Sequence, residues 1–202
     1  MQTVSDQPQT NLACGPRQAS RPGPERASVA AAAGDEARAM PTVPQIPDLE
    51  ALVNAAVLEV FATMLRFQVQ AVPCPSPQLN GQPMIVGAVG FNGVLNGVAY
   101  LHATVEFARA MTRLMLGPQE AELDAEGLVD DTFGELTNMV VGHLKSRLAD
   151  RGWSCALTIP TLIRGGHFKI RPLSTAERRI FCFRCDDNQL VAEVVLAPPQ
   201  PL

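Results

Sequence analysis

Val129-Asp-Asp-Thr-Phe-Gly-Glu-Leu-Thr-Asn-Met-Val-Val-Gly-His-Leu-Lys145 is the stretch from which the fold is most readily inferred. It lies within residues 123–150, where apolar side chains recur at helical spacing. At about 100° per residue, these side chains gather on one side of the predicted helix. This apolar stripe consists of Val129, Phe133, Leu136, Val140 and Leu144. We therefore expect a long helix that packs against a core through this stripe.

The opposite side of the same helix carries polar and small residues, all within about 40° of Asp131. This polar stripe consists of Asp131, Glu135, Asn138, Gly142 and Lys145. A solvated surface is the ordinary interpretation of such a face. However, Asn138 is a mediocre choice for a helix interior, and Gly142 costs ~1 kcal/mol relative to alanine there. These two residues favour a face that binds a partner or performs catalysis.

The segments before this helix show helical and extended patterns in turn. Apolar residues at helical spacing predict a helix over 48–66, with Asp48 as its N-cap. Residues 84–91 and 97–104 predict the two strands of a hairpin, because Asn-Gly turn signals lie between them. Helical spacing then returns over residues 106–116.

Three extended segments follow the long helix, at residues 154–163, 178–185 and 189–196. An Asp-Asp-Asn turn joins the last two. Strands that are grouped apart from helices are typical of an α+β fold with antiparallel pairing. We expect an antiparallel β-sheet packed against two long helices and one shorter helix.

The two ends of the chain differ from the part between them. Residues 1–46 are rich in Pro, Ala, Gln, Ser and Arg and contain no aromatic residue. Such a segment lacks the large apolar groups that offset the entropy cost of ordering, so we expect a disordered tail. Residues 198–202 form a second, Pro-rich tail, which leaves 47–197 as the folded domain.

Composition excludes several classes of protein. The chain has 202 residues and a formal net charge of −4, whereas proteins that bind nucleic acid usually show a basic field. No run approaches the ~20 apolar residues that a membrane span needs. The start has no basic region followed by an apolar run, so we expect no secretory signal. Five cysteines are an odd count, which argues against the disulfide framework of a secreted mini-protein. We expect a cytoplasmic protein.

Asp131, Glu135 and Asn138 are spaced as in the signature of the CheC/CheX/FliY family of chemotaxis phosphatases, which this chain resembles. That signature has an Asp or Ser, a Glu four residues later and an Asn three residues after it. A proline follows further along in a strand, and Pro160 stands at or next to that position. The order of predicted elements over about residues 47–197 also resembles the CheX branch of the family.

The resemblance implies a phosphatase that hydrolyses the phospho-aspartate of a CheY-like receiver domain. It implies that Asn138 holds the attacking water and that Glu135 pairs with a lysine of the receiver. Asp131 would support the site by positioning Glu135 or touching the receiver. Gly142, Lys145 and Pro160 are expected to contact the partner or support the site. The receiver would supply Mg²⁺, so that the chain has no cofactor of its own.

Some members of the family carry a second copy of the motif in the first helix. The comparable stretch here contains Glu59, but Ala55 and Ala62 replace the acid and the amide. We therefore expect one active site per chain. This pattern resembles CheX, in which two chains form a homodimer, and an unpaired sheet edge would be a physical route to one.

Other motifs point to packing rather than chemistry. Cys182 and Cys185 have CxxC spacing but lie in a strand-like run, so we interpret them as packing residues. His102, His143 and His167 have no acid placed beside them in the sequence, and His143 falls toward the buried side of its helix. One alternative function stays open: an adaptor of the same fold that binds a receiver or a flagellar-switch protein without hydrolysis.

Overall fold

The structure is a computed structural model that describes residues 42–74, 81–117, 126–166, 171 and 175–198. All of them belong to one compact unit, residues 39–202. Most of the expected N-terminal tail and the last residues of the C-terminal one lie outside these ranges. Val43 and Ile46 already pack against the core, ahead of the predicted domain start at residue 47.

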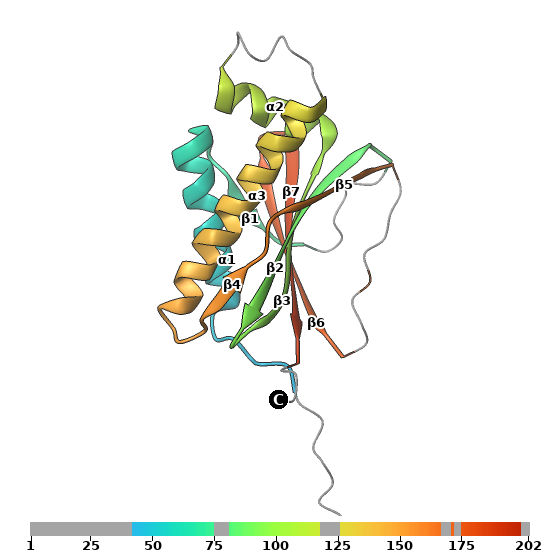
Figure 1. Ribbon diagram of the computed structural model, residues 1–202. Coiled ribbons are helices and arrows are strands. Elements are labelled where there is room, and N and C mark those ends of the chain that lie inside the picture. The colour runs from blue at the N-terminus through green and yellow to red at the C-terminus, as the bar shows by residue number, and fades with distance from the viewer. Residues whose placement is uncertain (1–41, 75–80, 118–125, 167–170, 172–174, 199–202) are drawn as a thin grey trace, which may run out of the picture. The chain divides into compact units, whose positions relative to one another are not determined.

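A single antiparallel sheet forms one layer of the described unit, in the order β1-β6-β7-β3-β2 followed by β4 and β5, which both pair with β2 (Figure 1). The strands are β1 (Gln70–Val72), β2 (Met84–Gly93), β3 (Asn96–Thr104), β4 (Cys155–Leu157), β5 (Thr161–Gly165), β6 (Glu177–Cys185) and β7 (Asn188–Ala197). The predicted antiparallel pairing is confirmed. The short strand β1 was not predicted.

Three helices lie on one face of this sheet (Figure 1). They are α1 (Leu49–Val60), α2 (Val105–Leu116) and α3 (Glu126–Ala149), and α1 runs on into the π-helix η1 (Phe61–Leu65). The predicted helix over 48–66 is therefore α-helical only in its first part. Alternate residues of the central strands, such as Leu101 in β3 and Ala192 in β7, complete the core under the helices.

Close contact between α3 and β2 depends on Gly87. A Cβ atom at this position would lie only 2.1 Å from the side-chain oxygen of Thr137 on α3. Thr137 is buried, and its hydroxyl donates a hydrogen bond of 2.7 Å to the carbonyl of Phe133 one turn earlier. The missing side chain at Gly87 and this internal hydrogen bond allow a polar residue to pack directly on the sheet.

Of the N-termini of α1 and α2, only that of α2 has a side chain that caps the helix. Thr104 caps α2, because its hydroxyl accepts a hydrogen bond of 3.1 Å from the backbone N–H of Phe107. The prediction of Asp48 as the cap of α1 is wrong in its mechanism. Asp48 has a left-handed backbone, with φ of 58°, and its side chain makes no capping hydrogen bond.

Candidate functional site

The polar stripe of α3 lies on the side of the helix that faces away from the core. Asp131 and Glu135 are exposed, whereas Asn138, Gly142 and Lys145 are half-buried. Every residue of the predicted apolar stripe is buried. The helix therefore has the orientation that its periodicity predicts, and its acid and amide side chains border on solvent.

Glu135 and Asn138 make no side-chain hydrogen bond or ion pair within the residues that the structure describes. They are three positions apart on one helix, so their side chains project from neighbouring points of the same face. A carboxylate accepts hydrogen bonds and attracts a cation, whereas a carboxamide both donates and accepts. Since no described residue takes up their hydrogen-bonding capacity, the two groups are suited to engaging a partner from outside.

The edge formed by β4 and β5 borders the polar stripe on one side. Arg164 of β5 forms an ion pair with Asp130 in the first turns of α3. Further along, a Cβ atom on the buried Gly134 would lie 3.7 Å from Leu162. Residue numbers fall from Arg164 to Leu162 along β5 while they rise from Asp130 to Gly134 along α3. The strand therefore runs antiparallel to the helix. Leu157 of β4 lines one cavity with Lys145 of α3. Residues 158–160 therefore lie beside the part of α3 between Gly134 and Lys145, which includes Asn138.

Pro160 lies in an irregular connection rather than within a strand. Phe91 pairs with Leu157 and Ala88 pairs with Thr161, so residues 158–160 stand opposite only two residues of β2. One extra residue in an edge strand is a β-bulge, and it divides the predicted strand 154–163 into β4 and β5. The proline cannot donate to a ladder, which suits this position.

The helix α1 borders the polar stripe on its other side and carries Glu59. This acid forms an ion pair with Arg147 of α3 and lies 3.5 Å from Nδ1 of His143. The hydrogen bond from Arg147 is the largest influence that holds the pKa of Glu59 below its usual value. The expectation that His143 lies on the buried side, without an acid partner, is wrong: its side chain is 41% exposed and faces Glu59.

The structure also separates Glu59 from Ala62, which stands at the amide position of the second motif copy. Glu59 is in the last turn of α1, while Ala62 is in the π-helix η1. A π-helix spaces residues differently from an α-helix, so the pair lacks the regular α-helical geometry that relates Glu135 to Asn138.

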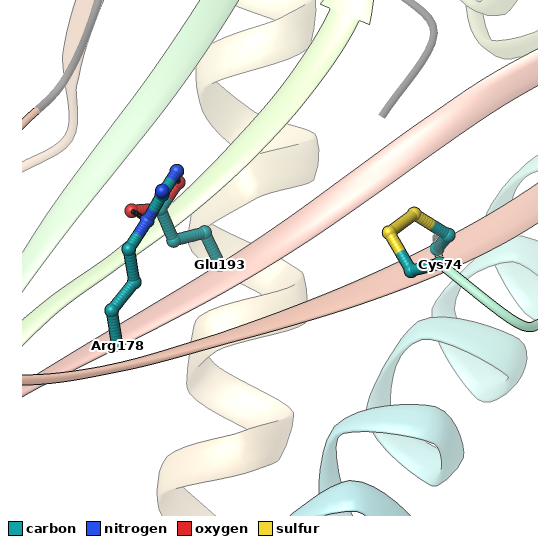
Figure 2. Close-up of a disulfide and its surroundings, with 4 residues drawn as sticks. Cys74, Arg178 and Glu193 are labelled. Carbon is teal, nitrogen blue, oxygen red and sulfur yellow. Dashed lines mark hydrogen bonds and ion pairs between the residues drawn. A yellow bond between two sulfur atoms is a disulfide. The ribbon is translucent and has the colours of Figure 1, made fainter. Parts of the chain in front are cut away.

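The face of the sheet away from the helices holds a second polar cluster. Glu193 of β7 is 1% exposed and accepts hydrogen bonds of 2.6 and 2.8 Å from Arg178 of β6 (Figure 2). Nε2 of His102 lies 3.3 Å from the same carboxylate. Burial alone would raise the pKa of Glu193, but His102 and Arg178 outweigh it and hold that pKa below its usual value.

This cluster corrects the expectation that His102 has no acid beside it. A signal was present in the sequence, since Glu193 is a single acid within the apolar run of residues 190–197. A buried acid requires a cationic or hydrogen-bonding partner. The partners come from two other strands, and their pairing could not be read from the sequence. Both oxygens of Glu193 accept hydrogen bonds from Arg178, so this carboxylate is already paired inside the chain.

The interpretation of Cys182 as a packing residue is corrected by a disulfide with Cys74, which lies just after β1 (Figure 2). The two Cα atoms are 5.2 Å apart, and the bond joins positions separated by 108 residues. Cys185 is buried as expected, and burial with the nearby Asp186 raises its pKa to about 12. Burial also raises the pKa of Cys155. Because the thiolate is the reactive form, the raised pKa of both thiols argues against a role as nucleophile.

The described residues contain neither a metal centre nor a helix that could span a membrane. They hold no group of three or more His, Cys, Asp or Glu residues that could bind a metal ion. None of the described helices is both long and apolar enough to cross a membrane. His167 lies outside the described ranges.

Comparison with known proteins supports one family. The model of the family described as "Chemotaxis phosphatase CheX" matches residues 85–184, a range that includes both the polar stripe of α3 and Pro160. No curated protein matches the chain.

Several solved structures share the fold. The chain is similar to chemotaxis protein CheX from Vibrio vulnificus, with 22% identity over 74% of this chain and 96% of that one, and a TM-score of 0.62. A CheC-like superfamily protein from Shewanella sp. PV-4 has 23% identity over 75% and 99%, with a TM-score of 0.62. CheX of Borrelia burgdorferi, crystallised in a CheX-CheY-BeF3-Mg²⁺ complex, has 18% identity over 74% and 98%, with a TM-score of 0.58.

Proposed function

We propose that the chain is a chemotaxis phosphatase of the CheX family, whose model matches residues 85–184, and that it hydrolyses the phospho-aspartate of a CheY-like receiver domain. One observation carries this proposal: Glu135 and Asn138 lie on the outward side of α3, side by side, with no partner among the described residues. The crystallised complex of the Borrelia relative with CheY supports a receiver as the partner.

Asn138 holds the attacking water in this mechanism. The amide NH2 group can donate a hydrogen bond to the water, and the amide oxygen can accept one from it, without the amide being protonated. The water oxygen attacks phosphorus, the bond from phosphorus to the aspartate oxygen breaks, and inorganic phosphate leaves. Phosphoryl transfer depends mainly on positioning and on charge stabilisation, so a single well-placed amide is sufficient on this side of the reaction.

Glu135 orients the receiver. Its free carboxylate pairs with a lysine of the receiver's active site, and the helical spacing brings that contact next to the water held by Asn138. Asp131, one turn before Glu135, contributes a second acid to the contact surface. Gly142 and Lys145 continue the stripe. Beyond the backbone of its own helix and its chain neighbours, no described atom lies within 4 Å of where a Cβ on Gly142 would be, which leaves open space there.

The receiver supplies Mg²⁺, which neutralises charge on the phosphoryl oxygens. The BeF3-Mg²⁺ complex of the Borrelia relative supports this assignment. A homodimer and a cytoplasmic location complete the proposal, the second because CheY-like receivers are expected there. The short edge strand β1, at the end of the sheet away from β4 and β5, offers the sheet edge for a dimer.

Phosphate release from phosphorylated receiver domains of the same organism, in the presence of Mg²⁺, tests the proposal. The wild-type protein is expected to accelerate release from at least one receiver, and Asn138→Ala is expected to leave the spontaneous rate. Equal rates with both proteins, together with detectable binding, would instead identify an adaptor built on a phosphatase fold.

A further inference from the structure

Ile159 is the most exposed large apolar residue in the part of the chain that the structure describes. Its side chain is 85% exposed, compared with 54% for Val94 and 52% for Leu114. Single exposed apolar residues are common on protein surfaces, so exposure alone indicates nothing. The rigidity of its backbone and its place beside the polar stripe of α3 distinguish Ile159 from the other two.

Hydrogen bonds fix the bulge that carries Ile159. The backbone N–H of Thr158 donates to the carbonyl of Gly90 at 2.9 Å, and the N–H of Gly90 donates to the hydroxyl of Thr158 at 2.9 Å. That hydroxyl donates in turn to the carbonyl of Ile159 at 3.1 Å. The following Pro160 restricts the backbone of Ile159 to extended conformations, and its β-branched side chain has few rotamers. Little conformational entropy would be lost if a partner covered it.

The position of Ile159 places it within reach of any protein that engages Asn138. Leu162 lies against Gly134 and Leu157 lines one cavity with Lys145, so the bulge at residues 158–160 lies beside the part of α3 that includes Asn138. A specific protein interface covers about 800 Å² on each partner. A receiver seated over Asn138 therefore also covers the bulge at residues 158–160.

The polar stripe needs an apolar neighbour to bind tightly. Its exposed charged groups, Asp131 and Glu135, orient a partner and raise the rate of encounter, but exposed charges contribute little affinity. Most binding energy in protein interfaces comes from a few buried apolar or aromatic groups.

We propose that Ile159 is the apolar anchor of the receiver-docking surface and packs against an apolar patch beside the receiver's phosphorylation pocket. This proposal rests on the proposed function, because it takes a receiver as the partner. Ile159 supplies affinity, whereas Asn138 and Glu135 act on the phosphoryl group and the receiver lysine. The two tasks can therefore be separated by kinetics.

Steady-state phosphate release at varied concentrations of a phosphorylated receiver, with Mg²⁺, tests the proposal. Ile159→Asp is expected to raise KM at least about tenfold, while kcat stays within about twofold of wild type. Ile159→Val keeps most of the apolar contact and should stay close to wild type. Val94→Asp and Leu114→Asp, which place the same charge at other exposed apolar positions, should leave KM unchanged.

Binding to the same receiver loaded with beryllofluoride and Mg²⁺ provides a second readout. The proposal expects Ile159→Asp to weaken binding by the same factor as it raises KM. A KM and a Kd within about twofold of wild type, in a preparation where Asn138→Ala is inactive, would overturn the anchor but not the phosphatase. A wild-type protein that neither binds nor dephosphorylates any receiver of the organism would overturn both.

Discussion

Glu193 in β7 and Glu135 on α3 are acids on opposite sides of one sheet, and they differ in burial and in hydrogen-bond partners. Glu193 is almost completely buried, and Arg178 and His102 occupy its oxygens. Glu135 is exposed and has no partner within the described residues. A buried charge must be paired inside the protein, so we interpret Glu193 as a structural residue that affects the stability of the fold. Glu135, which no described residue satisfies, is the acid that the proposed function uses.

Glu59 on α1 stands between these extremes. It is partly exposed, but Arg147 and His143 of α3 hold it in place. Its carboxylate therefore links two helices and is not free to meet a partner. This difference between Glu59 and Glu135 agrees with the proposal of one active site, on α3 and not on α1.

Of the predicted effects, that of Arg178→Met on stability should be the largest. This substitution disrupts the polar cluster of Glu193, Arg178 and His102. The substitution leaves Glu193 buried with its bidentate partner removed, so we expect a loss of about 3 kcal/mol in the free energy of unfolding at pH 7. Denaturant unfolding measures it. Arg179→Met is the matched control, since Arg179 is exposed on the same strand and pairs with Glu177 at the surface. It should cost no more than about 1 kcal/mol.

The pH dependence of the same pair of variants sharpens this prediction. In the wild type the pKa of Glu193 is lowered, so its contribution to stability is present above the pKa of the unfolded side chain, about 4.3. The contribution is lost as the pH falls through the lower pKa of the folded state. The difference between wild type and Arg178→Met should therefore narrow below about pH 4.3. A difference that stays constant through this range would contradict the role of the ionised carboxylate.

Glu135→Ala and Glu59→Ala, compared in one assay, test the contrast between the two helices. Glu135→Ala removes the proposed ion pair with the receiver lysine, so kcat/KM for receiver dephosphorylation should fall about 100-fold. Glu59→Ala should keep kcat/KM within about twofold of wild type, with some loss of thermal stability. Equal losses of activity in both variants would show that the two acids do not differ in role.

Ala62→Asn is expected to have the smallest effect. Added to Asn138→Ala, it restores the motif residues of α1 without restoring their geometry, because Ala62 lies in a π-helix and Glu59 is already paired. Phosphate release should remain at the rate of Asn138→Ala alone. Recovery of activity would mean that α1 retains a usable second site.

Local patterns in the sequence were sufficient to predict α2, α3 and the hairpin of β2 and β3, because periodicity and turn residues act over a few positions. The orientation of α3 followed from the same periodicity, and with it the exposure of Glu135. Features that depend on distant pairing could not be predicted in this way. The disulfide of Cys74, the cation beside Glu193 and the bulge at residues 158–160 each require knowledge of which strands become neighbours.

The central claim is that Asn138 acts on the bound phosphoryl group and not on docking. The most direct test measures two quantities for Asn138→Ala: its Kd for a receiver carrying beryllofluoride and Mg²⁺, and its rate of phosphate release from the phosphorylated receiver. The account predicts a Kd within about threefold of wild type and no acceleration of release. Release at the wild-type rate, or a loss of binding as large as the loss of activity, would contradict it.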